Sequence, residues 1–292
     1  MARPQELLEP DAVHAFGVFA DHLNFTAAAA RLHLSQPSLH TKIRKLQAGL
    51  GVDLYEREGR VLRLTTAGQR LAAYARDCTR RADDLLGDLT DSPAPVMLAA
   101  GRGTFRWVLG DGVRRLTRSG RPLHVLVADR QEALAALTDG RVDLAVVAHD
   151  PPPPHLRSQP LARYPQVLLA PRGSRLARLD EVRLADLEGL ALVVPPAGRP
   201  HRSTLERALA DAGVTWSVAA EVDGWDLLAH FAALGLGVTV VNGCVRPPAG
   251  LVAVPVRDLP QVTYHAVWRA EREDLALVVL ERLRPATPDA TA

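Results

Sequence analysis

Hydrophobic residues recur at helical spacing in the first part of the chain and predict three short helices. Pro10 suits the first turn of a helix, and an apolar face with a period of 3.6 residues follows it. Thr26 is a suitable N-cap for a second helix of small apolar residues that ends near His33. Ser35 is a candidate N-cap for the third helix, where Pro37 in the first turn costs no hydrogen bond. The pattern therefore predicts three helices around one small core.

The third helix places its apolar residues on one side. Leucine and isoleucine cluster there at 100° per residue, at Leu39, Ile43, Leu46 and Leu50. The opposite side presents Pro37, Ser38, Thr41, Arg44 and Lys45, flanked by His40 and Lys42. Such a helix pair is typical of a helix-turn-helix, whose second helix enters the major groove of DNA. An amphipathic pair inside an ordinary core has the same pattern, so the surrounding charge has to decide.

Basic residues concentrate around this helix pair. Between Arg31 and Arg63 seven basic residues stand against three acidic ones, whereas the whole chain has a formal net charge of only +2. The only two lysines of the chain, Lys42 and Lys45, both lie on the third helix. This concentration favours nucleic-acid binding through phosphate contacts.

The next segments predict a wing and a long helix. Arg57-Glu58-Gly59-Arg60 forms a turn between two short strands, and Arg57, Arg60 and Arg63 line this wing, either against DNA or in solvent. From Thr66 to roughly Thr90 an apolar stripe recurs in steps of three and four, at Leu71, Tyr74, Cys78, Ala82, Leu85 and Leu89. A helix of about 24 residues is roughly 36 Å long, which a small winged domain does not cover. The stripe therefore needs a partner.

Beyond Pro93 and Pro95 short β-rich runs alternate with helical stretches. The predicted strands are Val96–Ala100, Leu123–Ala128, Val142–Val147, Val167–Ala170, Leu190–Val194, Val238–Val241 and Val262–Val267. The predicted helices are Thr104–Leu116, Arg130–Thr138, Ser203–Ala212, Trp225–Leu234 and Glu271–Leu283. This alternation predicts an α/β region with largely parallel sheets.

Several linked motifs resemble the LysR-type transcriptional regulators. In chain order they are Asn24-Phe25-Thr26-Ala27-Ala28-Ala29-Ala30-Arg31-Leu32, Leu34-Ser35-Gln36-Pro37-Ser38-Leu39, Ile43-Arg44-Lys45-Leu46, Leu50-Gly51-Val52-Asp53-Leu54-Tyr55-Glu56-Arg57 and Leu64-Thr65-Thr66-Ala67-Gly68. The resemblance is weaker over the remaining chain, whose length and element order also fit the family. His40 stands where the family usually has a serine that faces DNA, and Thr41 where arginine is common, so the operator sequence is expected to differ from that of typical members.

The resemblance implies a multidomain chain. It has a winged helix-turn-helix at residues 1–66, a linker helix at 67–92 and an α/β effector-binding domain at 93–285, followed by a disordered tail at 286–292. The effector-binding domain resembles periplasmic-type solute-binding proteins, with subdomains at about 93–162 plus 268–285 and at about 163–267. The crossover strands between them are expected near 161–165 and 266–269.

The resemblance assigns residues to two surfaces, and the ends of strands and starts of helices suggest residues for a third. The DNA-binding residues would be Thr26, Ser35, Gln36, Pro37, Ser38, His40, Thr41, Lys42, Lys45, Arg57 and Arg60. The linker helix would pair with its twin through Leu71, Tyr74, Leu85 and Leu89. The effector would bind Arg102, Thr104, Arg130, His149, His201, Arg202 and Trp225.

Most of the effector residues follow a strand or open a helix, where free N–H groups and arginines favour anions. Taken singly, each also fits a solvated surface position, and Trp225 also fits a half-buried core tryptophan. As a set they predict a site for a small carboxylate, with Trp225 stacking on its apolar part.

Other classes of function find little support in the sequence. No apolar run approaches a membrane span and no signal peptide is visible, so we expect a cytoplasmic protein that does not bind a membrane. We find no catalytic residues, metal ligands or cofactor motif, since Arg106 replaces the third glycine after Gly101-Arg102-Gly103. Two alternatives remain open: a redox sensor that uses Cys78 or Cys244, and a solute-binding protein or enzyme with the same α/β fold.

The sequence thus predicts a regulator of transcription that is not an enzyme. Its expected partners are double-stranded operator DNA with an inverted repeat, further copies of itself in a homodimer or homotetramer, a small-molecule effector and, if it activates transcription, RNA polymerase.

Overall fold

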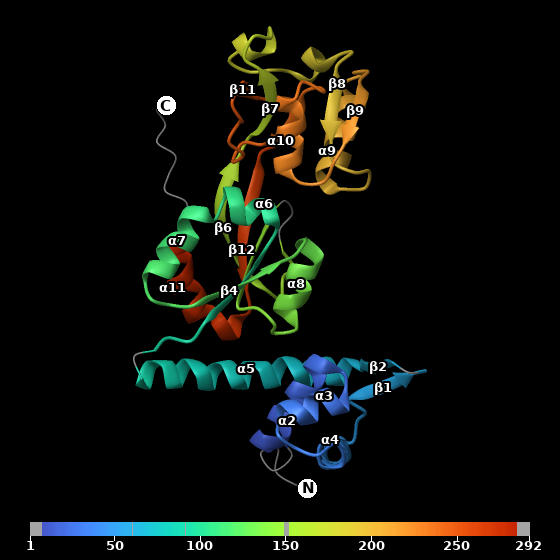
Figure 1. Cartoon of the computed structure of the whole chain (residues 1–292), viewed down its shortest axis with the longest axis vertical. Coiled ribbons are helices and arrows are strands. Elements are labelled where there is room, and N and C mark those ends of the chain that lie inside the picture. The colour runs from blue at the N-terminus through green and yellow to red at the C-terminus, as the bar shows by residue number, and fades with distance from the viewer. Residues whose placement is uncertain (1–7, 60, 91, 149–151, 285–292) are drawn as a thin grey trace. The chain divides into compact units, whose positions relative to one another are not determined.

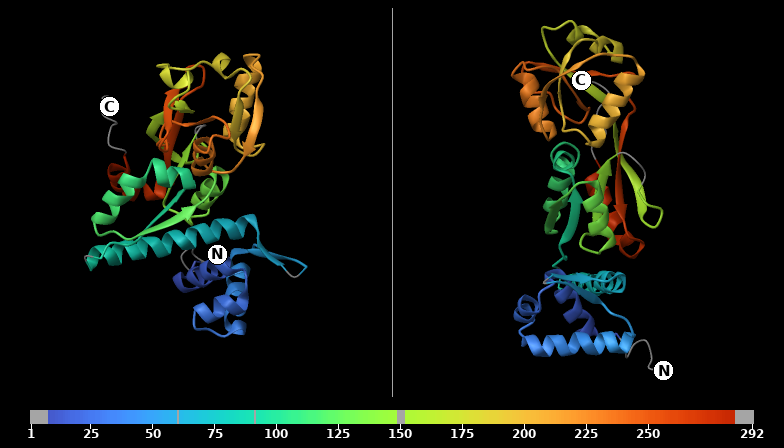
Figure 2. Two further views of the ribbon diagram at one scale, coloured as in Figure 1. Left: turned by 45° about the horizontal axis from the view of Figure 1, so that its top comes forward. Right: turned by 90° about the vertical axis from the view of Figure 1, so that its right-hand side faces the viewer.

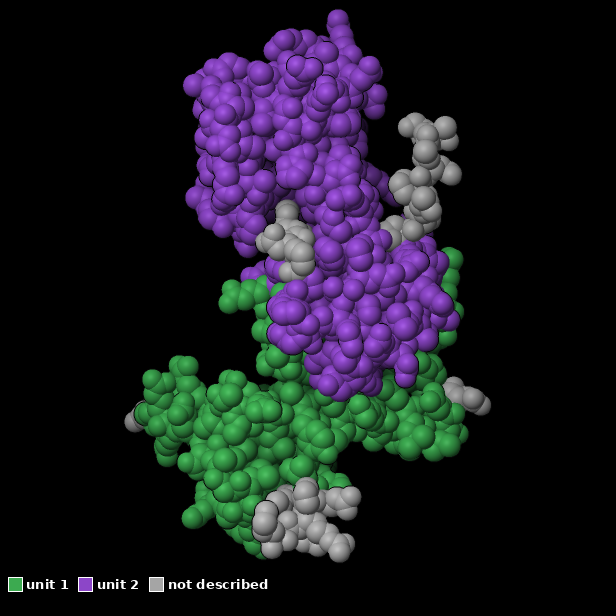
Figure 3. Space-filling model, turned by 180° about the vertical axis from the view of Figure 1, so that it is seen from behind, with its two compact units in different colours: residues 1–99, 117–126, 131–145 green, residues 100–116, 127–130, 146–292 purple. Residues whose placement is uncertain are grey.

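The computed structural model describes residues 8–59, 61–90, 92–148 and 152–284. The chain divides into two compact units, drawn in green and purple in Figure 3. The first comprises Met1–Ala99, Thr117–Leu126 and Gln131–Ala145, and the second Ala100–Leu116, Val127–Arg130 and Val146–Ala292. Among the described helices, none is long and apolar enough to cross a membrane.

The N-terminal elements form a winged-helix domain that packs on one long helix (Figure 1). They are α2 (Pro10–His22), α3 (Phe25–Arg31), α4 (Gln36–Leu50), β1 (Tyr55–Glu58), β2 (Val61–Leu64) and α5 (Thr66–Leu89). Phe16, Phe19, Leu39 and Ile43 are fully buried in its core. Each such side chain stabilises the fold by about 1.5–3 kcal/mol relative to an exposed one. The strands β1 and β2 pair antiparallel, so the three predicted helices and the wing are all present.

Capping side chains set where the helices begin. The N-cap of α3 is Asn24, whose Oδ1 accepts a hydrogen bond from the backbone N–H three residues on, at 3.1 Å. The prediction that Thr26 caps this helix is wrong, because the amide of Asn24 reaches the free N–H groups first. Ser35 caps α4 as predicted, and its Oγ accepts from the N–H of Ser38 at 3.2 Å.

The turn between α3 and α4 also differs slightly from the prediction. Helix α3 ends at Arg31, two residues before its predicted end. His33 adopts a left-handed backbone with φ of 55°, which a helix does not continue. Helix α4 ends in the more usual way, at the left-handed Gly51.

The start of α5 is fixed against the winged-helix domain. Thr65 Oγ1 accepts a hydrogen bond from the N–H of Gly68 at 3.1 Å. A Cβ at Gly68 would lie 1.8 Å from the carbonyl oxygen of Leu54, so only glycine permits this approach. Leu71, which the sequence placed in a dimer seam, is instead 9% exposed and lies in the winged-helix core. It lies one turn after Gly68, where α5 packs against α2.

The rest of α5 continues as one uninterrupted helix (Figure 2). Several of its apolar side chains are exposed. Tyr74, Leu85, Leu86 and Leu89 are 48%, 59%, 57% and 73% exposed. The predicted unpartnered stripe is therefore present from Tyr74 onward.

Two arginines of α5 hold this helix within the first unit. Arg76 pairs with Asp21 of α2 at 2.6 Å and donates to the carbonyl of Asp139 at 2.6 Å. Arg80 pairs with the buried Asp143 at 3.0 Å. Neither contact was predictable from the sequence, because each joins residues more than 50 positions apart.

The remainder of the chain alternates strands and helices, as predicted. The strands are β3 (Val96–Ala100), β4 (Leu123–Val127), β5 (Leu144–Ala148), β6 (Arg157–Tyr164), β7 (Gln166–Pro171), β8 (Ala191–Val194), β9 (Ser217–Glu221), β10 (Thr239–Asn242), β11 (Leu251–Pro255) and β12 (Val262–Trp268). The α-helices are α6 (Arg102–Trp107), α7 (Gly110–Arg118), α8 (Arg130–Thr138), α9 (Pro200–Asp211), α10 (Trp225–Ala233) and α11 (Glu273–Leu283), with short 3₁₀ turns η1 (Leu176–Arg178), η2 (Leu184–Leu187) and η3 (Ala270–Arg272).

These strands form three sheets, with orders β4-β3-β5-β12-β6, β10-β7-β11 and β8-β9. The prediction of largely parallel sheets is wrong for β10-β7-β11 and for the β12–β6 pair, which are antiparallel. The parallel pair β8–β9 is joined through the single helix α9, which is the kind of connection that parallel pairing needs.

The chain passes between the five-stranded and three-stranded sheets twice. The first passage lies between β6 and β7 at Pro165, as predicted. The second lies between β11 and β12, at residues 256–261, and not near 266–269 as predicted. All of β12 pairs with β6 in the five-stranded sheet, so its apolar run belongs there and not to the second subdomain.

One predicted helix is two helices. The stretch 104–116 is divided between α6 and α7. The N–H of Leu109 bonds to the carbonyl of Thr104 at 2.9 Å, which closes α6 before Gly110 begins α7. Periodicity alone did not show this break.

Candidate nucleic-acid interface and effector site

Helix α4 presents the polar face that the sequence predicted. Leu39 and Ile43 are fully buried under it, while Thr41, Arg44 and Lys45 are exposed. Among the described residues, no carboxylate lies within ion-pair distance of Arg44 or Lys45. This face therefore offers two unneutralised cations beside hydroxyl groups.

The first turn of α4 is tied to α3 by side chains that were predicted to contact DNA. Thr26 Oγ1 donates to Gln36 Oε1 at 3.1 Å, and the hydroxyls of Ser35 and Ser38 lie 2.7 Å apart. Pro37 completes this turn. All five side chains are exposed, so the turn offers donors and acceptors in a fixed arrangement.

His40 differs from the other residues of the face because it is half-buried. Its ring packs against Phe25, with ring centroids 5.1 Å apart. Phe25 in turn contacts Phe19 and Tyr55. His40 thus joins the domain core to the exposed face.

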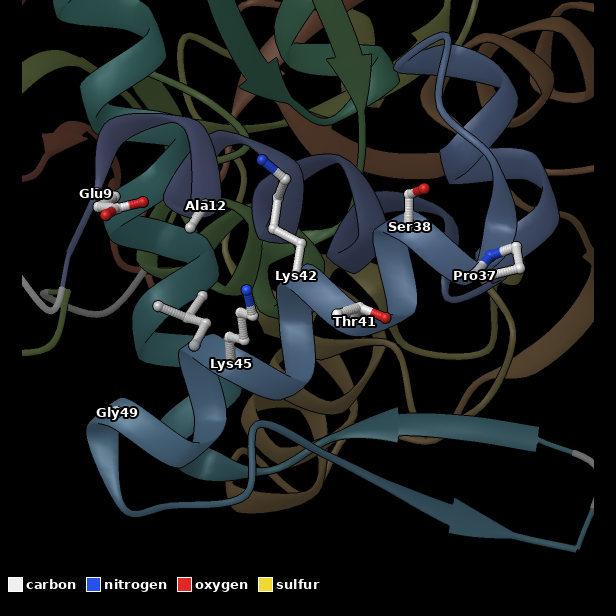
Figure 4. A pocket seen from close by; sticks show the side chains of 9 residues that line it. Glu9, Ala12, Pro37, Ser38, Thr41, Lys42, Lys45 and Gly49 are labelled. Atoms are coloured by element: carbon white, nitrogen blue, oxygen red, sulfur yellow. The ribbon is translucent and has the colours of Figure 1, made fainter.

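A groove of about 670 Å³ runs between the start of α2 and α4. Its lining is Glu9, Ala12, Pro37, Ser38, Thr41, Lys42, Lys45, Leu46 and Gly49 (Figure 4). Lys42 Nζ forms an ion pair and hydrogen bond with Asp11 Oδ2 on α2. Asp11 was not among the predicted site residues, because its local signal in the sequence is only that of an acid in the first turn of a helix.

The wing carries its own charged contacts. Arg63 pairs with Glu58 at 2.8 Å, and Arg57 Nε donates to the carbonyl of Gly59 at 3.0 Å. Both arginines are exposed. Arg60 lies outside the described residues.

In the second unit, three helix starts meet at the candidate effector site. Trp225 opens α10, and its ring lies 4.6 Å from that of His201, centroid to centroid. A Cβ at Gly103 of α6 would come within 2.3 Å of Trp225 Cδ1, so Gly103 admits this indole. Arg106 and Asp226 form an ion pair at 3.1 Å between the same two helices. Sequence reasoning missed Gly103.

Two predicted effector residues keep groups available for a ligand. Thr104 is buried, yet no described residue hydrogen-bonds to its hydroxyl. Arg102 is exposed at the first position of α6. His201 is buried, and its Nε2 lies 2.8 Å from the carbonyl oxygen of Val240. This nitrogen therefore already has a hydrogen-bond partner within the protein.

The other arginines predicted to bind the effector already interact with groups of the protein. Arg202 is buried, pairs with Glu206 at 2.7 Å and lies over the ring of Trp216, so its predicted contact with an effector is not supported by its geometry. Arg199, which precedes it, pairs with Asp223 at 2.7 Å.

Arg130 is half-buried and donates to the carbonyl of Ala148 at 3.3 Å. Burial, and secondarily the charge of Arg130, lower the pKa of His265. The guanidinium of Arg130 thus donates a hydrogen bond to a backbone carbonyl of the protein and places positive charge near His265. His149 lies outside the described residues.

The two cysteines differ sharply in environment. Cys78 is exposed on α5. Cys244 Sγ lies 3.7 Å from the hydroxyl of Tyr264, and burial raises the pKa of its thiol to about 11. Within the described part of the chain, no three His, Cys, Asp or Glu side chains are grouped so that they could hold a metal ion.

Comparison with known families gives two matches that together span most of the chain. Residues 10–69 match the family described as bacterial regulatory helix-turn-helix protein, lysR family. Residues 119–284 match the LysR substrate binding domain.

Individual proteins resemble the chain over most of its length. It is 32% identical over 238 residues to a probable hydrogen peroxide-inducible genes activator of Streptomyces viridosporus, covering 78% of this chain and 76% of that protein. It is 26% identical over 243 residues to the RuBisCO operon transcriptional regulator of Allochromatium vinosum, covering 79% and 78%.

Solved structures share the fold. A full-length OxyR variant from Pseudomonas aeruginosa superimposes with a TM-score of 0.75 at 22% identity and 96% coverage of both chains. Full-length CbnR in complex with its target DNA gives a TM-score of 0.59 at 22% identity, covering 95% of this chain and 99% of that one. The winged helix-turn-helix joined to an α/β domain, as predicted from the sequence, is therefore confirmed.

Proposed function

Because the chain belongs to the LysR family of DNA-binding transcriptional regulators, which carry an effector-binding domain, we propose that it binds an inverted-repeat operator as a homo-oligomer and responds to a small organic anion. We propose the domain limits given above: residues 1–66 bind DNA, 67–92 form the linker helix and 93–285 bind the effector. It would act in the cytoplasm, where bacterial DNA lies.

The observation that carries the DNA-binding proposal is the exposed face of α4. Its hydroxyl groups at Ser38 and Thr41 can hydrogen-bond to base edges, whereas Arg44 and Lys45 can contact phosphates. The helix begins with a cap that fixes its N-terminal turn, which is the part that enters the groove in helix-turn-helix proteins. The wing arginines Arg57 and Arg63 would add backbone contacts.

The homo-oligomer is supported by the exposed stripe of α5. Tyr74, Leu85, Leu86 and Leu89 expose apolar surface on a helix that the winged-helix domain covers only at its start. Pairing of two such helices would bury the stripe and present two recognition helices to two half-sites. If the protein activates transcription, RNA polymerase would be a further partner.

The effector proposal rests on the helix starts around Trp225. The hydroxyl of Thr104, which has no hydrogen bond among the described residues, the exposed Arg102 and the N–H groups that open α9 all suit a carboxylate. The indole of Trp225 offers an apolar surface beside them. An effector that binds one arrangement of the two subdomains more tightly would shift the population toward it and so change how the DNA-binding domains engage the operator.

The redox alternative uses the same fold but a different signal. Burial keeps Cys244 protonated near neutral pH, which disfavours a thiolate that reacts with oxidants. The sequence resemblance to a peroxide-inducible genes activator keeps this alternative open through Cys78. An oxidant that changes DNA binding by wild type, but not by Cys78→Ala, would favour it.

The deciding experiment is footprinting, combined with anisotropy titrations, on duplex DNA from upstream of the protein's own gene. Lys45→Ala should weaken binding to every sequence and reduce the salt slope by about 0.9, as expected for one lost phosphate contact. Arg207→Ala, an exposed arginine of α9, is the matched control and should behave as wild type. If no duplex binds, a solute-binding or enzymatic function becomes the better explanation, and an unchanged Lys45→Ala would place the interface elsewhere.

A further inference from the structure

We propose that Asp11 is a positioning residue that holds Lys42 away from DNA phosphates and thereby limits affinity for DNA of any sequence. This inference rests on the proposed DNA-binding function. It concerns a residue outside the helix-turn-helix, on the first turn of α2.

The geometry joins two elements that lie far apart in the sequence. Asp11 and Lys42 are 31 positions apart, and their side chains form an ion pair across the groove between α2 and α4. The side chain of Lys42 is 29% exposed and that of Asp11 is 78% exposed. Figure 4 shows Lys42 extending from α4 toward the α2 ribbon that carries Ala12. Lys42 therefore lies along the protein surface.

Lys45, one turn further along α4, is the internal comparison. It lines the same groove, but among the described residues no carboxylate lies within ion-pair distance of its ammonium group. Lys42 therefore already forms an ion pair with a carboxylate, whereas Lys45 on the same helix forms none with the described residues. A phosphate can contact Lys45 directly, whereas it has to displace Asp11 to contact Lys42.

This competition has a definite sign. A phosphate that binds Lys42 must break the pair and then lies close to the displaced carboxylate, which repels it. Because phosphates carry no sequence information, the cost applies to operator and random DNA alike. Removal of the carboxylate should therefore add one phosphate contact and strengthen binding in general.

The test compares full-length wild type with Asp11→Asn and Lys42→Met, singly and together. Binding of a fluorescein-labelled random-sequence duplex and of an upstream fragment is followed by anisotropy over a range of NaCl concentrations. Asp11→Asn should bind both duplexes about two- to fivefold more tightly, the range expected for release of an exposed ion pair. Its salt slope should be steeper by about 0.9.

The double variant separates release of Lys42 from a general loss of negative charge. Once Lys42 is replaced by methionine, Asp11→Asn should no longer steepen the salt slope, and only a small charge effect on affinity should remain. Glu9→Gln is the matched control, since Glu9 lines the same groove without an ion pair to Lys42, and its small charge effect should persist in the Lys42→Met background. Asp11→Glu keeps the carboxylate and should bind as wild type.

The outcomes are distinguishable. Unchanged or weaker binding by Asp11→Asn would overturn the inference, and a merely structural role of Asp11 predicts weaker binding. An Asp11→Asn effect that survives Lys42→Met and exceeds the small charge effect of Glu9→Gln would also overturn it. If wild type shows no salt-dependent binding to either duplex, the proposed function itself fails.

Discussion

Cys244 shows how burial sets the chemistry of one side chain. Its thiol is held beside the hydroxyl of Tyr264, and loss of solvent raises its pKa to about 11. Alkylation requires the thiolate, so in the Cys78→Ala variant the rate of modification by iodoacetamide should still rise about tenfold per pH unit between pH 8 and 10. Rates measured by mass spectrometry over this pH range would test this expectation.

The unfolded chain is the control for this measurement. In urea the same cysteine should react faster, and its rate should level off near pH 9, the ordinary pKa of a free thiol. A folded-state rate that already levels off near pH 9 would mean that the thiol is accessible. Cys244 would then regain its place as a candidate redox residue.

At the scale of single residues, the sequence predicted those features that depend on residues close by in the chain. The exposed polar face of α4 follows from a single helical period, so Thr41 and Lys45 lie where expected. The N-cap was misplaced because Asn24 and Thr26 are both good caps and spacing does not rank them. The contact between Asp11 and Lys42 was not predictable, since it depends on how two helices cross.

Helix α5 leaves several large apolar side chains exposed. Leu85 on the exposed stripe is expected to lie in the pairing surface of two chains. Leu85→Glu should shift the protein to a smaller mass in light scattering at low concentration, because two glutamates would face each other in an apolar seam. Leu71→Glu is not a clean test, since Leu71 lies inside the winged-helix core.

A matched control is available elsewhere on the surface. Leu179 is 41% exposed, and Leu179→Glu should keep the wild-type mass. Circular dichroism of both variants should match wild type, because neither leucine is in the core. A Leu85→Glu protein that keeps its full mass would rule out this part of α5 as the seam.

At the scale of elements, predictability followed continuous apolar runs. Strand β3 and helix α8 have the predicted limits, because each combines a clear period with clear ends. The strands β9 and β11 were missed, since each has exposed or mixed positions. Strand β6 was expected only in part, as a crossover strand near 161–165. It begins at Arg157 and includes Pro160, which an edge strand tolerates.

For the whole molecule, the order of domains was predictable but the sheet topology was not. Linked motifs along the first 68 residues carried the family resemblance, and with it the winged helix and the α/β domain. The position of the return passage at residues 256–261 depends on the sheet in which β12 pairs. The apolar sequence of β12 would suit either sheet, so the sequence did not decide this. The contact of Gly103 with Trp225 likewise arises only when two distant segments meet.

The last prediction concerns the molecule's response to a ligand at the helix starts around Trp225. A small carboxylate should bind the hydroxyl of Thr104 and the positive groups near it, and so stabilise the folded protein by RT ln(1 + [L]/Kd). At a hundredfold excess over Kd this is about 2.7 kcal/mol, which a thermal-shift assay detects. A screen of acidic, neutral and basic metabolites should therefore raise the melting temperature only with acidic compounds.

Thr104→Val removes the hydroxyl with little change in side-chain shape and should reduce the shift caused by any anionic hit. Thr138→Val is the matched control, because its hydroxyl bonds only to the carbonyl of Leu134 within α8 and has no role at the site. A hit that stabilises Thr104→Val as much as wild type would place the ligand elsewhere. Stabilisation by neutral or cationic compounds alone would contradict the anionic class, because the exposed Arg102 and the opening N–H groups of α9 favour negative charge.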